Sequence, residues 1–124
     1  MTRIDNITLW RLRVPLFRPY HLTGVILSEL DVLLAEVRDQ DGRKGCGEAV
    51  IIPHYTTETT QDGWKFCCER AAELVGKDSA TAKAALEPHR RDYPHAVTVM
   101  QVAIEMAEGH PLLEPPVELS LIHI

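Results

Sequence analysis

The stretch that decides the fold is LDVLLAEVRDQDGRKGCGEAV, residues 30–50. An apolar run over residues 32–37 is followed by Asp39-Gln40-Asp41-Gly42 and then by a second segment over residues 44–50. A glycine-containing turn between two such segments is typical of a β-hairpin. Residues 7–16, ITLWRLRVPL, alternate apolar and polar side chains and predict one more strand. The sequence therefore predicts a three-stranded antiparallel meander.

Two loops are predicted beside these strands. Residues 16–30, LFRPYHLTGVILSEL, contain Pro19 and Gly24 and predict a loop too long for a tight hairpin. A second loop, IIPHYTTET, follows the third strand over residues 51–59. In a meander both loops lie at the same end of the sheet, so they either flank one cleft or are two ordinary surface loops. Each combines apolar or aromatic side chains with polar tips, as pocket walls do.

Three helices are predicted after the strands. Thr56, Thr57 and Thr59 offer N-cap hydroxyls for a helix that ends at Gly76. Asp78 or Ser79 caps a shorter helix through residue 86, and residue 94, a proline, begins a third helix that ends at residue 109, a glycine. Strands followed by helices indicate the α+β class.

Composition excludes several kinds of protein. The chain has 124 residues, enough for one domain, with 45% hydrophobic and 25% charged residues, which is typical of a globular protein. A net charge of -5 disfavours nucleic acid as a partner. No signal sequence and no apolar run of roughly 18 residues is present, so we expect a cytoplasmic protein without a membrane partner. Three cysteines, an odd number, favour plain thiols in a reducing compartment over a redox or metal role.

Cys46, Glu48 and His54 are the candidates for chemistry within the chain. A thiolate needs a nearby base, and His54 follows Cys46 by eight residues. However, Cys46 lies mid-strand between two glycines, a pattern that favours close backbone approach. Glu48 is either a base or a hydrogen-bond partner for a loop. The six histidines show neither His-Glu-x-x-His nor zinc-finger spacing. We therefore expect no catalytic residue and no metal site built by this chain alone.

Three segments resemble a known family. They are VPLFRPYHLTG, LDVLLAEVRDQDGRKGCGEAVIIPHYTTET and TVMQVAIEMAEGHPLL. Together they resemble the amino-terminal capping domain of the enolase superfamily, in its mandelate racemase and muconate lactonizing enzyme branch. The most specific part is the Asp-Gly turn followed by Gly-x-Gly-Glu-Ala and by Tyr-Thr-x-Glu-Thr at a helix start.

The resemblance implies a cap whose chemistry lies elsewhere. In that superfamily, a (β/α)8 barrel removes the proton alpha to a carboxylate with a lysine or histidine base, and Mg²⁺ stabilises the enolate. The two loops of the cap close over the barrel mouth. Glu48 and its neighbouring glycines then belong to the scaffold. Carried onto this sequence, the substrate-binding lid residues are Arg18, Tyr20, His21, Leu22, Thr23, Ile52, His54 and Tyr55.

The resemblance covers residues 1–117 and stops where the first barrel strand is expected. Residues 118–124, ELSLIHI, do not resemble that strand, and we expect a truncated or non-native tail there. The expectation is thus a fragment that is inactive alone. Its parent would be a homo-oligomeric Mg²⁺-dependent isomerase or lyase that acts on a small carboxylate, as a racemase, epimerase or cycloisomerase. The alternative is a complete small α+β module that binds a ligand or a protein.

Overall fold

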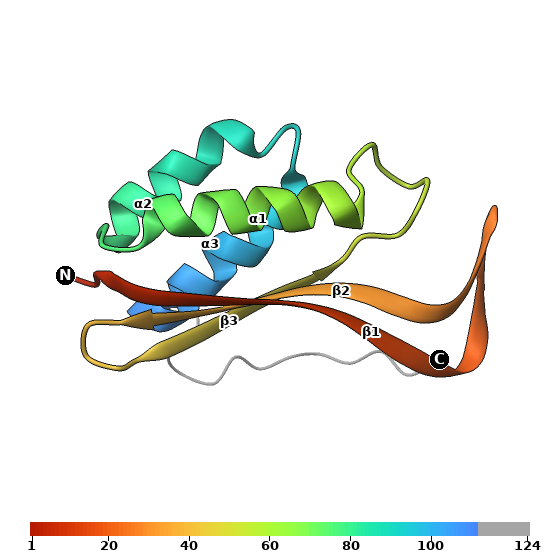
Figure 1. The fold of residues 1–124 in the computed structure, drawn as a ribbon, viewed down its shortest axis with the longest axis horizontal. Coiled ribbons are helices and arrows are strands. Elements are labelled where there is room, and N and C mark those ends of the chain that lie inside the picture. The colour runs from red at the N-terminus through yellow and green to blue at the C-terminus, as the bar shows by residue number, and fades with distance from the viewer. Residues whose placement is uncertain (112–124) are drawn as a thin grey trace.

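The computed structural model describes residues 1–111 and shows a three-stranded sheet covered on one face by helices (Figure 1). Three antiparallel strands, β1 (Ile4–Leu22), β2 (Val25–Asp39) and β3 (Lys44–Val50), lie in the order β1-β2-β3. Helices α1 (Thr60–Leu74), α2 (Ser79–Leu86) and α3 (Pro94–Glu108) follow, with a short 3₁₀ helix, η1 (Glu87–His89), before α3. The predicted α+β class and meander are confirmed.

Helix α3 packs directly on β3 because two glycines in that strand have no side chain. A Cβ atom on Gly45 would lie 2.1 Å from the carbonyl oxygen of Ala103, and one on Gly47 would lie 2.0 Å from that of Val99. The close backbone approach predicted around Cys46 is therefore present. The core lies between the sheet and the helices and includes Ile4, Leu33, Ala35, Val37, Leu74, Leu86, Val97, Val99, Met100, Ala103 and Ile104.

The turn between β2 and β3 is fixed by Asp39. Its buried carboxylate accepts hydrogen bonds from the backbone N–H groups of Asp41 and Arg43, at 2.9 and 2.8 Å, and from Nε of Arg43 at 2.8 Å. Burial alone raises the pKa of Asp39, but these hydrogen bonds outweigh burial and lower it below its usual value. The predicted Asp-Gly hairpin is confirmed, with Gly42 at a φ of 82°.

The predicted long loop between the first two strands is wrong. Tyr20, His21 and Leu22 pair with Leu27, Ile26 and Val25, and the only break at the tip is a tight turn over residues 23 and 24. Gly24 has a φ of 80°, a conformation that glycine adopts without strain. Pro19 lies outside the regular ladder, so it interrupts the pairing without ending the strand.

The helix boundaries follow the predicted caps. Thr59 caps α1 through a hydrogen bond from the backbone of Asp62, and Asp78 caps α2 through one from Thr81. Pro94 begins α3, and Gly109 ends it in the left-handed conformation. The predicted domain boundary at residue 117 and the predicted tail over residues 118–124 lie outside the described residues. Within the described part of the chain, no helix has the length and apolar character to cross a membrane.

Candidate functional site

A large bulge shapes the outer half of the β1–β2 hairpin. Pro15 pairs with Glu29 and Tyr20 pairs with Leu27, so residues 16–19 of β1 lie opposite the single residue Ser28 of β2. Proline has no N–H to donate to a strand ladder, and Pro15 and Pro19 bracket the unpaired segment. Bulges of this kind redirect side chains and occur near functional sites. Here the bulge forms one wall of a cavity.

The cavity has a volume of about 390 Å³ and lies between this bulge, β2 and the end of β3. Its lining is apolar except for one guanidinium and one phenol: Leu16, Phe17, Arg18, Tyr20, Leu27, Leu30, Val50 and Ile52. A smaller cavity of about 140 Å³ shares Leu27, Leu30, Val50 and Ile52 with it, and a third, of about 200 Å³, continues under the second loop past Pro53 and His54. The β1–β2 hairpin and the second loop therefore border three neighbouring cavities.

The second loop touches the hairpin tip. The phenol of Tyr55 donates a hydrogen bond to the carbonyl oxygen of Thr23, with 3.4 Å between the two oxygens. Beside it, His54 has a φ of 72°, in the left-handed region that residues other than glycine seldom occupy. The structure thus places the second loop in contact with the tip of the β1–β2 hairpin.

The base of the second loop is held by Glu58, whose side chain is completely buried. Its carboxylate accepts hydrogen bonds from the backbone N–H groups of His95 and Ala96, at 2.8 and 3.0 Å, in the first turn of α3. It also lies 2.7 Å from Nδ1 of His95. A carboxylate at a helix N-terminus is favoured by the helix dipole. Glu58 therefore fixes the loop to the helical layer, a role that the sequence analysis missed.

The charged side chains around the cavities differ in whether they have a hydrogen-bond or ion-pair partner. Arg11 donates two hydrogen bonds to Asp31, at 3.0 and 2.8 Å, and a third to Gln61 of α1. The two hydrogen bonds from Arg11 to Asp31 lower the pKa of Asp31 below its usual value, although partial burial opposes the shift. Arg18, by contrast, has no hydrogen-bond or ion-pair partner within residues 1–111.

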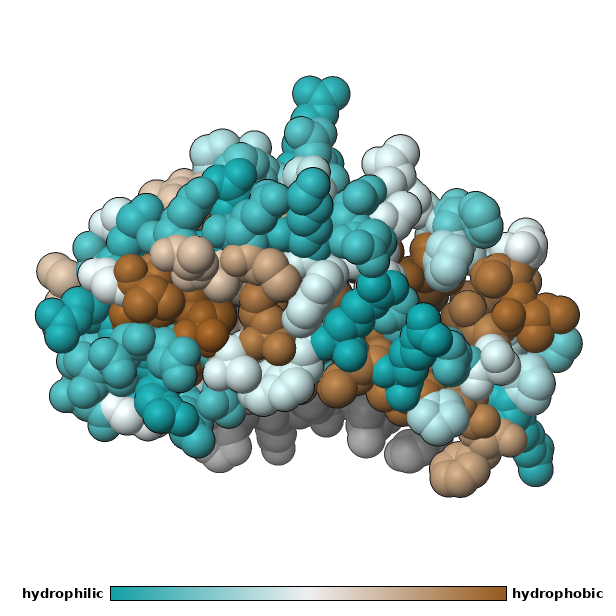
Figure 2. Space-filling view, viewed as in Figure 1, coloured by the Kyte–Doolittle hydropathy of each residue, from teal (hydrophilic) through white to brown (hydrophobic). Residues whose placement is uncertain are grey.

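Apolar side chains gather at the outer end of the hairpin, on the right of Figure 2. Phe17 is fully exposed, and Tyr20, Ile26 and Tyr55 are each more than half exposed. Exposed apolar groups that cluster beside a cavity are typical of a surface that meets a ligand or another protein. This end of the molecule is therefore the candidate functional site.

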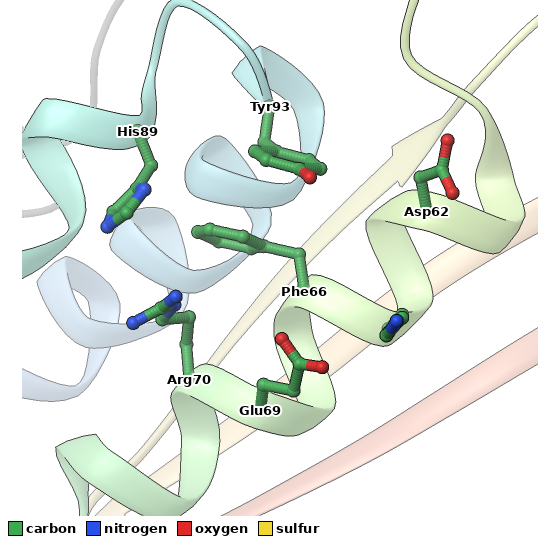
Figure 3. Close-up of a pocket in the computed structure, with 7 residues that line it drawn as sticks. Asp62, Phe66, Glu69, Arg70, His89 and Tyr93 are labelled. Carbon is green, nitrogen blue, oxygen red and sulfur yellow. The ribbon is translucent and has the colours of Figure 1, made fainter.

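A separate pocket lies on the helical layer (Figure 3) and is explained by packing. Phe66 projects into it, stacked on Tyr93 with ring centroids 4.6 Å apart, and Arg70 lies over the Phe66 ring at 5.5 Å. Its rim is formed by polar groups of α1, including Asp62, Lys65 and Glu69. Because the ring of Phe66 belongs to the core, we interpret this pocket as the open edge of the packing between α1 and the segment 89–93 that precedes α3.

The predicted lid residues are distributed over this site. Arg18, Tyr20 and Ile52 line the cavity of about 390 Å³ and His54 lines the third cavity, while Tyr55 and Thr23 form the contact between the second loop and the hairpin tip. His21 and Leu22 instead occupy ladder positions opposite Ile26 and Val25. Sequence reasoning missed five of the walls: Leu16, Phe17, Leu27, Leu30 and Val50.

Cys46 and Glu48 lie on the opposite face of β3 from the glycines that contact α3. Both are exposed, and no hydrogen bond joins the Cys46 thiol to a histidine in the described chain. Among residues 1–111, no group of three or more histidine, cysteine, aspartate or glutamate side chains is arranged to hold a metal ion. The described residues therefore do not fit Mg²⁺, and we assign no chemical step to a metal in this chain.

Comparison with known proteins identifies relatives. No family model matches the sequence. The chain is 29% identical over 128 aligned positions to the L-Lys-D/L-Arg epimerase of Methylococcus capsulatus, covering 98% of this chain and 34% of that protein. The chain thus spans about a third of the length of this curated relative.

Solved structures share the fold. A mandelate racemase/muconate lactonizing protein from Herpetosiphon aurantiacus superposes with a TM-score of 0.72 at 23% identity, over 83% of this chain and 30% of its own. A muconate lactonizing enzyme from Pseudomonas fluorescens superposes with a TM-score of 0.72 at 24% identity, over 90% of this chain and 32% of that enzyme. N-succinyl Arg/Lys racemase from Bacillus cereus superposes with a TM-score of 0.74 at 20% identity, over 89% of this chain and 31% of that racemase. The resemblance predicted from the sequence is confirmed at the level of the fold, which this chain shares with about 30% of the length of each of these enzymes.

Proposed function

Since the chain has the amino-terminal fold of mandelate racemase/muconate lactonizing enzymes, we propose that it is a substrate-capping domain. It would cover the mouth of a (β/α)8 barrel that acts as a racemase, epimerase or cycloisomerase on a small carboxylate. The barrel and its Mg²⁺ supply the chemistry of proton removal next to the carboxylate. The residues of this chain supply walls, orientation and exclusion of water.

One observation carries the proposal: the second loop meets the tip of the β1–β2 hairpin, and both elements contribute residues to the lining of an apolar cavity. The contact from Tyr55 to Thr23 joins the loops, while Phe17, Tyr20 and Ile26 remain exposed beside the cavity. Apolar surface exposed at a joined pair of loops is what a lid needs in order to close on a second domain. Its burial would contribute roughly 25 cal/mol per Å² of apolar area.

A chimera tests the capping role. Residues 1–111 would replace the amino-terminal third of the Methylococcus capsulatus epimerase, and kcat/KM would be measured across a panel of dipeptides and N-acylamino acids. We expect an active chimera whose substrate preference differs from that of the parent. Tyr55→Ala should change the relative kcat/KM values at least about fivefold, because loss of one wall misplaces substrates unequally.

The matched control for the chimera is Val75→Ala, which changes an exposed apolar residue just after α1. It should leave the relative kcat/KM values unchanged. Circular dichroism and Mg²⁺ calorimetry would establish that the chimera is folded and loaded. A folded, Mg²⁺-binding chimera with no activity, or with preferences insensitive to Tyr55, would contradict the proposal and favour a self-contained binding module. That module is the alternative because the cavity of about 390 Å³ would offer it a place to bind a small ligand.

A further inference from the structure

We propose that the cavity under the β1–β2 hairpin selects ligands with an apolar side chain and disfavours cationic ones, and that Arg18 contacts an anionic group of the ligand. This inference deepens the proposed function, on which it rests for the ligand to be a substrate. It concerns which molecules the cap admits.

The apolar preference follows from the walls. Six of the eight residues lining the cavity are aliphatic or phenylalanine: Leu16, Phe17, Leu27, Leu30, Val50 and Ile52. They come from three strands and the second loop, so the apolar surface surrounds the hollow from several sides. An ammonium or guanidinium group placed there would lose water without gaining a carboxylate partner, because the lining contains no aspartate or glutamate. An isobutyl or phenyl group would instead be removed from water.

The acidic residues near the cavity do not provide a binding partner for a cationic ligand. Asp31 is bound by Arg11 at 2.8 Å, and the carboxylate of Glu29 lies 3.9 Å from Nε of Arg13. Glu58, which lines the third cavity, is buried and caps α3. Each acid lining the three cavities therefore already faces a basic group or a helix N-terminus. A cationic ligand finds no uncommitted carboxylate among these described walls.

Arg18 is the charged residue that lines the cavity of about 390 Å³ without a partner in the described chain. It lines the cavity from within the bulge and has no partner among residues 1–111, whereas Arg11 and Arg13 of the same strand each face an acid. A planar guanidinium binds a carboxylate through two parallel hydrogen bonds. The position of Arg18 at the edge of an apolar hollow therefore suits a molecule with an apolar body and one anionic end.

The test is titration of the 124-residue protein, observed through the methyl resonances of Leu27, Leu30, Val50 and Ile52. Four probes isolate the groups involved: N-acetyl-L-leucine, N-acetylglycine without the apolar body, N-acetyl-L-leucinamide without the anion, and Nα-acetyl-L-lysine with a cationic side chain. We expect saturable shifts at the cavity with N-acetyl-L-leucine and at least about fivefold weaker binding of each other probe. Equal or tighter binding of the lysine probe, or no binding of N-acetyl-L-leucine, would overturn the proposal.

Two variants isolate the charge. Arg18→Gln should bring the affinity for N-acetyl-L-leucine down to that for its amide, while the amide itself binds as before. Arg13→Gln changes a neighbouring arginine that faces Glu29 and should keep the wild-type preference. If Arg13→Gln abolishes the preference and Arg18→Gln does not, the assignment of Arg18 is wrong.

This titration needs no barrel, so it separates the two proposals. A selective cavity together with an inactive, folded chimera would reject the capping role and retain the ligand class. An active chimera together with an unselective cavity would reject the ligand class alone.

Discussion

The carboxylate of Glu58 and the imidazole of His95 lie 2.7 Å apart, although 37 residues separate them in the sequence. The same carboxylate accepts the backbone N–H groups of His95 and Ala96. One buried side chain near the end of the second loop therefore binds the first turn of α3 and connects the loop to that helix. The position of the loop over the cavity depends on this connection.

Glu58→Ala should destabilise the fold by about 2–4 kcal/mol, because it leaves two helix N–H groups and the imidazole without their acceptor. Glu58→Gln, which keeps one carbonyl oxygen, should cost about half as much. Urea denaturation followed by circular dichroism measures both changes. Glu69→Gln, on the exposed surface of α1, is the matched control and should stay within about 0.5 kcal/mol of wild type. Equal stabilities for all four proteins would contradict the capping role of Glu58.

Gly47→Ala should be among the most damaging small substitutions in the chain. The added Cβ would lie 2.0 Å from the carbonyl oxygen of Val99 and 3.0 Å from the backbone nitrogen of Ala103, so α3 would have to move off the sheet. We expect a loss of about 3 kcal/mol or more, since backbone cannot yield as a side chain does.

Cys46→Ala is the control for Gly47→Ala, because the neighbouring side chain points to the other face of β3 and is exposed. It should change the free energy of unfolding by less than about 0.5 kcal/mol. If Gly47→Ala proves as mild as this control, the close contact between α3 and β3 is wrong.

Stability in acid should depend on Asp31. Hydrogen bonds from Arg11 depress the pKa of Asp31 in the folded protein. A depressed pKa contributes stability above the unfolded value of about 3.9, and this contribution is lost as the pH falls through the folded value. Asp31→Asn should therefore weaken the protein at pH 7 and flatten the fall in unfolding free energy below about pH 4. Asp5→Asn, at an exposed position, should keep the wild-type slope. Parallel pH profiles for wild type and Asp31→Asn would refute this linkage.

The helices and the second hairpin could be predicted because their signals are local. An Asp-Gly turn, a threonine or aspartate at each of two N-caps and a proline at the start of α3 specify those boundaries within a few residues. Gly45 and Gly47 likewise indicated close packing before its partner was known. In each case one short stretch contains both the residue and the reason for its structure.

The outer hairpin and the role of Glu58 could not be predicted because their causes are distant in the sequence. Pro15 and Pro19 each suggest the end of a strand, and only the pairing of residues 20–22 with residues 25–27 shows that β1 continues. Leu27 and Leu30 line a cavity together with residues 16–18, and this grouping follows from the register shift between residues 15 and 20, which no local pattern indicates. Nothing near Glu58 indicates a partner 37 residues later.

The contact between the two loops gives the last prediction. The oxygens of Tyr55 and Thr23 are 3.4 Å apart, longer than a typical hydroxyl hydrogen bond, so the contact is weak in energy although it connects the second loop to the hairpin tip. Tyr55→Phe should lower the global free energy of unfolding by no more than about 0.5 kcal/mol. Amide hydrogen exchange at the hairpin tip should nevertheless become faster, because local opening at residues 23–25 is governed by few contacts. Tyr20→Phe removes a phenol that has no hydrogen-bond partner in the described chain and should leave that exchange unchanged. If both variants exchange at the wild-type rate, the loops move independently and a lid made of two coupled loops is excluded.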